Sequence, residues 1–240
     1  MATLADYVVA VGARVPDDAG RLSDLSTSLG VTDVREARIL AAVRTYSRAR
    51  PRVIDATLTG DGTTQVWPAP TGWSQGFSTL CDYEYPIDQI PPVMVRPISD
   101  RLVVLRRDGV EQLGTVHALG AAEQARIHYQ ALHMVSASDD TVPASDFDAV
   151  ADLAAALCCE TLATFYAEST LSSLAADTVN HSGKAQLYAD VAQMHFKRYV
   201  NHMSPAEGGD GAGTILMGDI DIPTGRGGGS DYLFARRSLR

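Results

Sequence analysis

The spacing of hydrophobic residues changes twice along this chain, and the two changes restrict the folds open to it. Apolar residues recur every three or four positions before Pro51, alternate with polar residues between 52 and 135, and return to helical spacing after Pro143. We therefore predict an α+β fold: mainly a helical bundle, with a small antiparallel β-rich insertion and an extended C-terminal arm.

The first fifty residues predict two helices. Thr3 can cap the first one, and its apolar residues continue at helical spacing as far as Pro16. Residues 17–30 are rich in turn formers, so we expect no regular element there. The second helix is expected to open near Asp33 and to end at Pro51, because the residue before proline is disfavoured in the helical conformation.

Residues 52–135 predict a sheet of short strands. Arg107-Asp108-Gly109 separates two apolar runs and is typical of a hairpin turn, and residues 126–135 are the last strand candidate. Parallel strands need crossover helices, which this stretch lacks, so the sheet should be antiparallel. Six prolines divide the region: Pro68, Pro70, Pro86, Pro91, Pro92 and Pro97.

Two further helices are predicted within residues 143–203. Ser145, with Asp148 three residues later, suggests a capping box at the start of the first. The second should run over residues 184–203, with four inward-facing residues: Leu187, Val191, Met194 and Tyr199. Residues 1–203 would thus form the core of the protein.

The last 37 residues, 204–240, differ in composition from this core. They hold nine of the twenty glycines and lack helical periodicity. Such a segment is either a disordered, solubilising end or an arm that orders on a partner. In the second interpretation its apolar residues would anchor in a partner groove and its arginines would pair with acidic groups: Ile215, Leu216, Met217, Tyr232, Leu233, Phe234, Arg236, Arg237 and Arg240.

Charge and composition exclude several classes of protein. The formal net charge is −9 and the pI about 5.0, which argues against a general nucleic-acid binder. This charge does not exclude a protein that DNA passes without being bound. No run of 18 apolar residues is present, so we expect no membrane partner. Three cysteines, two of them adjacent at Cys158-Cys159, are typical of a reducing compartment or of indifference to redox state.

One motif suggests catalysis. Residues 72–76 match G-x-S-x-G, in which a buried strand leads into the nucleophile, here Ser74, and a helix leads away. The approach contains Pro68 and Pro70, and the residues that follow look like a strand. We therefore expect a solvated loop and no enzyme activity.

No pattern predicts a metal ion or another cofactor. His195 and His202 lie seven apart, His128 and His133 five apart, and adjacent cysteines on a helix point about 100° apart. Weaker patterns give no site either: Asp139-Asp140 should form a solvated turn, residues 225–230 lack the end of a P-loop, and Asp219 and Asp221 lack the rest of a calcium loop.

The order of elements resembles that of head–tail connector (adaptor) proteins of tailed bacteriophages. The resemblance covers residues 1–203 and rests on packing and turn patterns: Leu4-Ala5-Asp6-Tyr7, residues 41–47 before Arg50-Pro51, residues 58–62, Pro70-Thr71-Gly72-Trp73, and the Ala-rich stretch Val150 to Tyr166. These motifs supply no catalytic residues. The long arm departs from more compact adaptors.

This resemblance implies a structural virion protein of the neck, made in the host cytoplasm. Similar adaptors form dodecameric rings that bind the portal on one side and a stopper or tail protein on the other, with DNA passing through the channel. The arm would clamp the portal or a neighbouring subunit. A tail-completion or other neck protein, a serine hydrolase using Ser74, and a host-directed binding module are the alternatives.

Overall fold

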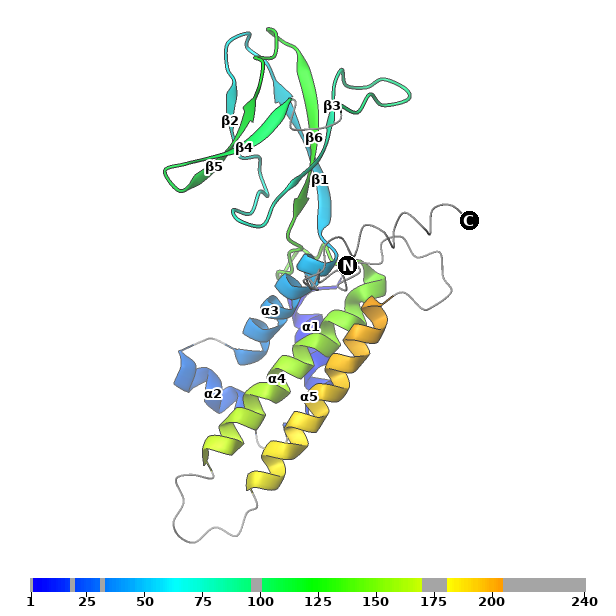
Figure 1. Cartoon of the computed structure of the whole chain (residues 1–240). Helices are drawn as coiled ribbons and strands as arrows, with labels where there is room; N and C mark the ends of the chain where they lie inside the picture. Colours follow the sequence, from blue (N-terminus) through cyan, green and yellow to red (C-terminus); the bar gives the residue numbers. More distant parts are fainter. Residues whose placement is uncertain (1, 18–19, 31–32, 96–100, 170–180, 205–240) are drawn as a thin grey trace, which may run out of the picture. The chain divides into compact units, whose positions relative to one another are not determined.

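The computed structural model describes residues 2–17, 20–30, 33–95, 101–169 and 181–204, and every structural statement below concerns these ranges (Figure 1). Residues 1–199 form one compact unit and residues 200–240 a second. Helices precede and follow two small antiparallel sheets, so the fold is mixed α+β, as predicted.

Three helices precede the sheets. In α1 (Leu4–Arg14) the predicted cap is confirmed, because Thr3 and Asp6 form a reciprocal capping box, and α3 (Val34–Ala49) begins after Asp33. The expectation of no regular element over 17–30 is wrong, since α2 occupies Arg21–Leu29. The Asp17 carboxylate accepts bonds from the first backbone N–H groups of that helix, and Leu22 is buried.

Six strands form the two sheets of the insertion. Their bounds are β1 Arg52–Thr59, β2 Val66–Pro68, β3 Leu80–Glu84, β4 Leu102–Arg107, β5 Val110–Thr115 and β6 Gln124–Ala131. The sheet orders are β1-β6-β3 and β2-β5-β4, with every pair antiparallel. Between the sheets lies a small apolar core: Leu58, Tyr83, Leu102, Leu113, Leu119, Ala125, Ile127, Tyr129 and Ala131.

The predicted hairpin is confirmed, whereas the last strand is shorter than expected. Asp108 and Gly109 both have positive φ angles, 51° and 77°, as a two-residue turn between β4 and β5 requires. Strand β6 ends at Ala131, because the backbone N–H of His133 bonds to a serine of α3 instead of continuing the ladder.

Gly60 closes the end of β1 where no larger residue fits. Its N–H donates to Glu123 O at 2.7 Å, and a Cβ built on it would lie 2.4 Å from Gly120 O. The chain then leaves for the other sheet, because β1 pairs with β6 and β2 pairs with β5. Because β1 is the first strand of the insertion and β6 the last, their pairing joins its two ends.

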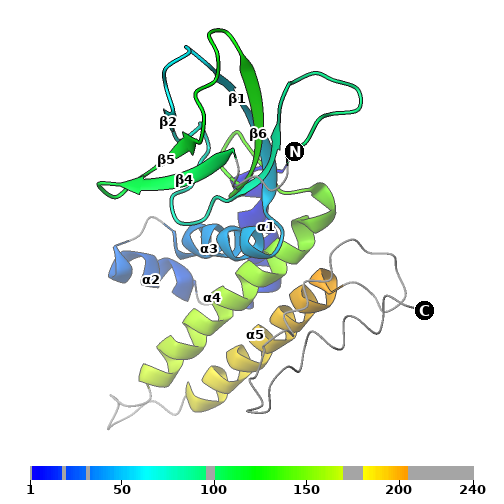
Figure 2. The same cartoon turned by 45° about the horizontal axis from the view of Figure 1, so that its top comes forward.

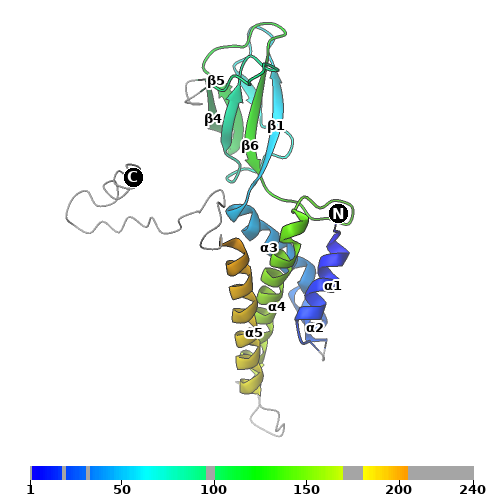
Figure 3. The same cartoon turned by 90° about the vertical axis from the view of Figure 1, so that its right-hand side faces the viewer.

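Two long helices follow the sheets: α4 (Phe147–Ser169) and α5 (His181–Met203) lie side by side in Figures 1, 2 and 3. The predicted Ser145 cap is wrong: a 3-10 turn, η2 (Ala144–Asp146), leads directly into α4, and Ser145 donates to the Asp146 carboxylate. Within the described ranges one helical stretch, Ala144–Glu168, is long and apolar enough to cross a membrane, but most of it is buried, as in the core helix of a globular protein.

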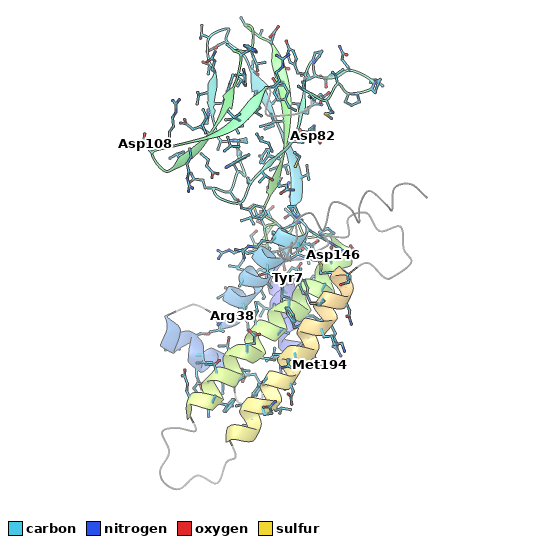
Figure 4. The ribbon with its side chains drawn as sticks, viewed as in Figure 1. Tyr7, Arg38, Asp82, Asp108, Asp146 and Met194 are labelled. Atoms are coloured by element: carbon cyan, nitrogen blue, oxygen red, sulfur yellow. The ribbon has the colours of Figure 1, made fainter. Side chains whose placement is uncertain are left out.

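The predicted inward face of α5 is wrong at two of its four residues, and Val191 is half-buried. Tyr199 is buried, but Leu187 and Met194 are 54% and 43% exposed, and the Met194 side chain is labelled in Figure 4. The face that packs consists of Tyr188, Ala192, His195 and Tyr199. Helix α5 uses aromatic and polar side chains for packing, since Tyr188 stacks on Tyr166 of α4 at a centroid distance of 5.4 Å.

Candidate functional site

A buried polar cluster holds the junction where α3 leads into β1. The Asp146 carboxylate, 5% exposed, accepts a hydrogen bond from the Tyr46 hydroxyl and another from Arg50 Nη1 at 2.8 Å. Burial raises the pKa of Tyr46, and the Asp146 carboxylate raises it further. The tyrosine hydroxyl therefore remains a proton donor, and the cluster ties α3 to the start of α4.

His133 extends this junction to the end of β6. Its Nδ1 lies 2.7 Å from Thr141 O and its Nε2 3.1 Å from Arg50 O, while its backbone N–H donates to Ser47 Oγ. Both ring nitrogens thus face backbone carbonyl oxygens. The side chain positions the backbone on both sides of the junction.

A second polar cluster joins α1, α4 and α5. Arg14 Nε donates to Asp152 Oδ1 at 3.0 Å, and Arg14 Nη2 donates to Asp148 Oδ1 at 2.7 Å. His195, 2% exposed, lies with Nδ1 2.9 Å from the same Asp152 oxygen. Asp152 is therefore shared by side chains from two other helices.

An apolar groove of about 220 Å³ opens beside α3. Leu40 is 38% exposed and Met134 57% exposed, so water reaches part of its lining. Arg44 lies at the groove and is exposed. The apolar side chains that line it are Leu40, Val43, Trp73, Leu132, Met134 and Val135.

Glu111 of β5 fixes the loop that forms one side of this groove. Its carboxylate accepts from Trp73 Nε1 at 2.9 Å and from Gly76 N at 3.1 Å. These two bonds hold the pKa of Glu111 below its usual value, the bond from Trp73 contributing most. The loop is thus anchored through Trp73, whose ring also lies 5.4 Å from that of Tyr129.

Ser74 lies in this loop and not at a strand-to-helix turn. Gly72 and Gly76 have φ angles of 88° and 74°, so the glycines of the motif serve the turns, as predicted. His133 lines the same groove, but both of its nitrogens face carbonyl oxygens. A serine hydrolase needs an imidazole nitrogen directed at the hydroxyl, and the described residues do not provide one.

A larger hollow of about 460 Å³ lies beside the loop after β3. Arg126 bridges two carboxylates there, those of Glu84 at 3.0 Å and Asp88 at 2.8 Å. The Glu84 side chain is 4% exposed, so this pair is partly desolvated. The charges in the hollow thus satisfy one another.

Among the described residues, no group of three or more histidine, cysteine or carboxylate side chains could hold a metal ion. Burial raises the pKa of Cys158 to about 12 and that of Cys159 to about 11, so both remain thiols at neutral pH.

The prediction of a solvated turn at Asp139-Asp140 is wrong for Asp140. Asp140 is 7% exposed and its carboxylate accepts the Val142 N–H at 2.8 Å.

The anchor residues predicted in the arm lie outside the described residues: Ile215, Leu216, Met217, Tyr232, Leu233, Phe234, Arg236, Arg237 and Arg240. The same holds for Asp219, Asp221 and the glycine-rich run at 225–230. The groove itself was not predicted from the sequence. Leu40 and Arg44, four residues apart on the predicted helix, were the available signal, but nothing local indicates that Trp73 and Met134 meet them.

Comparisons with known proteins add little to this site. No protein-family model matches the chain, and no curated protein matches it. It is similar to a chain in the "Neck of native GTA particle computed with C12 symmetry", at 15% identity over 72% of this chain and 90% of that one. A second similarity, at 14% identity over 64% and 76%, is to a chain in the "Neck of empty GTA particle computed with C6 symmetry". Both similarities have a TM-score of 0.25.

Proposed function

We propose that the chain is a structural subunit of the neck of a phage-like particle and forms a ring there. The ring lies between a portal protein and a stopper or tail protein, and DNA passes through its channel without sequence-specific contact. The subunit needs no cofactor and catalyses no reaction. Its resemblance to head–tail adaptors over residues 1–203 suggested this role.

The open edges of the two sheets carry the proposal. Within the described ranges, β1, β2 and β4 each pair with a neighbour on one side only. Strands β1 and β4 contain no proline, and β4 exposes Val103 and Val104 by 36% and 42%. An open sheet edge presents unpaired backbone groups on which a strand of another chain can pair.

A ring covers such edges in an ordered way. A head-to-tail interface uses two different patches on each subunit, and it closes when the rotation between neighbours divides a full circle. The exposed edge and apolar residues of one insertion would then meet a different patch on the next subunit.

The net charge of −9 is compatible with this role. A protein that neutralises phosphates with lysine and arginine gains affinity for DNA and would retain the genome in the channel. A net negative subunit repels phosphates instead.

Three other functions remain as alternatives. A tail-completion or other neck protein would share the particle but not the contact with the portal. The serine hydrolase is disfavoured by the geometry around Ser74, and a Ser74→Ala variant that assembles normally and loses no esterase activity would dispose of it. A host-directed binding module would be absent from purified particles.

Imaging of purified particles tests the proposal. We expect a label attached through Val9→Cys, at an exposed position in the middle of α1, to appear at the junction of head and tail in several symmetric copies. A chain found only in the lysate, or located elsewhere in the particle, would refute it.

A further inference from the structure

We propose that the groove beside α3 binds residues 215–221 of a neighbouring copy of this chain. The inference rests on the proposed ring, in which copies lie next to one another. In this proposal the groove binds the first apolar group of the arm, Ile215 to Met217. The second group, Tyr232 to Phe234, would bind another component of the neck.

The groove has the size and chemistry for a short aliphatic segment. An apolar cavity of about 150 Å³ is large enough to bind benzene, and this groove offers about 220 Å³. Leu40 and Met134 remain 38% and 57% exposed there, so an occupant would remove both from water. Ile215-Leu216-Met217 supplies consecutive aliphatic side chains.

The groove and the segment carry opposite charges. Arg44 and Arg48 lie four apart on the exposed side of α3, and neither pairs with a carboxylate among the described residues. The segment follows its aliphatic residues with Asp219 and Asp221, and no lysine or arginine occurs from 205 to 225. Aspartates placed two to six residues after the anchors can therefore face the two arginines.

The chain is long enough to make this contact. Ten residues separate Ser204, at the end of α5, from Ile215. An extended segment of that length spans about 35 Å, about the full length of a 23-residue helix at about 1.5 Å per residue. The segment can therefore reach a groove on another subunit that lies up to about 35 Å from the end of α5.

Disulfide trapping in the full-length chain tests the inference. One variant carries Leu40→Cys and the other Leu216→Cys, both with Cys81→Ser so that the partly exposed native thiol cannot compete. Because the engineered cysteines lie on separate chains, a Leu40→Cys to Leu216→Cys disulfide after co-expression can only be intermolecular. We expect a cross-linked dimer, and a yield reduced about tenfold by Arg44→Glu, an energy of about 1.4 kcal/mol.

Two controls make the test specific. Val9→Cys, at a 73% exposed position on α1, replaces Leu40→Cys and should give no dimer with Leu216→Cys. Asp219→Arg combined with Arg44→Glu should restore the yield. Equal cross-linking at Val9, or cross-linking only when both cysteines are on one chain, would overturn the inference. A ring of normal mass without the cross-link would refute this contact but leave the proposed function intact, whereas absence of a ring would refute the function.

Discussion

Helix α4 and the β-rich insertion bury their hydrophobic residues to different extents. In α4 an almost unbroken run is buried, from Ala149 to Ala156, and the small side chains allow α3 to pack closely against it. In the insertion, Leu113 and Ile127 are fully buried, but Val104 and Val110 are 42% and 48% exposed and Ile90 is 99% exposed. We infer that α4 contributes more to stability than the insertion does, and that the insertion presents surface to neighbouring molecules.

The largest expected effect is in α4. Leu162→Ala removes a fully buried side chain and should lower the free energy of unfolding by about 3 kcal/mol. Leu187→Ala on α5, where the side chain is 54% exposed, is the matched control and should cost less than about 1 kcal/mol. Urea denaturation measures both. Equal losses would contradict the proposed difference between core and surface.

The next effect is at the junction between the two regions. Asp146→Ala removes the shared acceptor of Tyr46 and Arg50 and should cost about 2 kcal/mol, because a buried hydroxyl is left without its partner. Asp148→Ala breaks an ion pair whose carboxylate is 80% exposed, and should cost less than about 1 kcal/mol. Thermal unfolding compares the two variants. If Asp146→Ala lowered the stability no more than Asp148→Ala does, this cluster would not hold the two regions together.

A smaller effect concerns the loop anchored by Glu111. Its pKa is lower in the folded protein than in the unfolded one, so its contribution to stability is complete above the ordinary carboxyl pKa and is lost as the pH falls through the lowered value. With Trp67→Phe, the fluorescence of Trp73 reports this loop alone. We expect the signal to change only as the pH falls below the ordinary carboxyl pKa, and Glu111→Gln to abolish that change. An unaltered acid transition in the variant would contradict the assignment.

The smallest effect on stability is expected at the edge of the insertion. Val104→Lys places a charge on a 42% exposed position of an edge strand and should change the free energy of unfolding by less than about 0.5 kcal/mol. It should nevertheless disrupt assembly, because a lysine opposes edge-to-edge pairing. Thr45→Lys on the exposed side of α3 is a control for added charge. Normal ring formation by Val104→Lys would exclude β4 from the interface.

The sequence was sufficient to predict local features and insufficient for contacts between distant segments. The Thr3 cap and the Asp108-Gly109 turn depend on neighbours in the chain, and both were predicted. Helix α2 was missed because its serines, threonine and aspartate resemble a turn, while Asp17 and buried Leu22 stabilise the helix.

The errors at the site have the same cause. Leu187 and Met194 are typical of a core face, yet α5 packs through Tyr188 and His195, whose partners Tyr166 and Asp152 lie on another helix. The groove combines Leu40 with Trp73 and Met134, which meet only because β1 pairs with β6. Contacts between residues so far apart in the chain cannot be predicted from a local sequence pattern.

The mass of the purified full-length chain in solution tests the central claim most directly. Light scattering coupled to gel filtration should show a closed assembly whose mass is a whole multiple of the 25.6 kDa subunit, and twelve copies match the resemblance to adaptors. The distribution should stay discrete as the concentration increases, because a ring has no free end. A species of 25.6 kDa at every concentration, together with its absence from particles, would contradict the account.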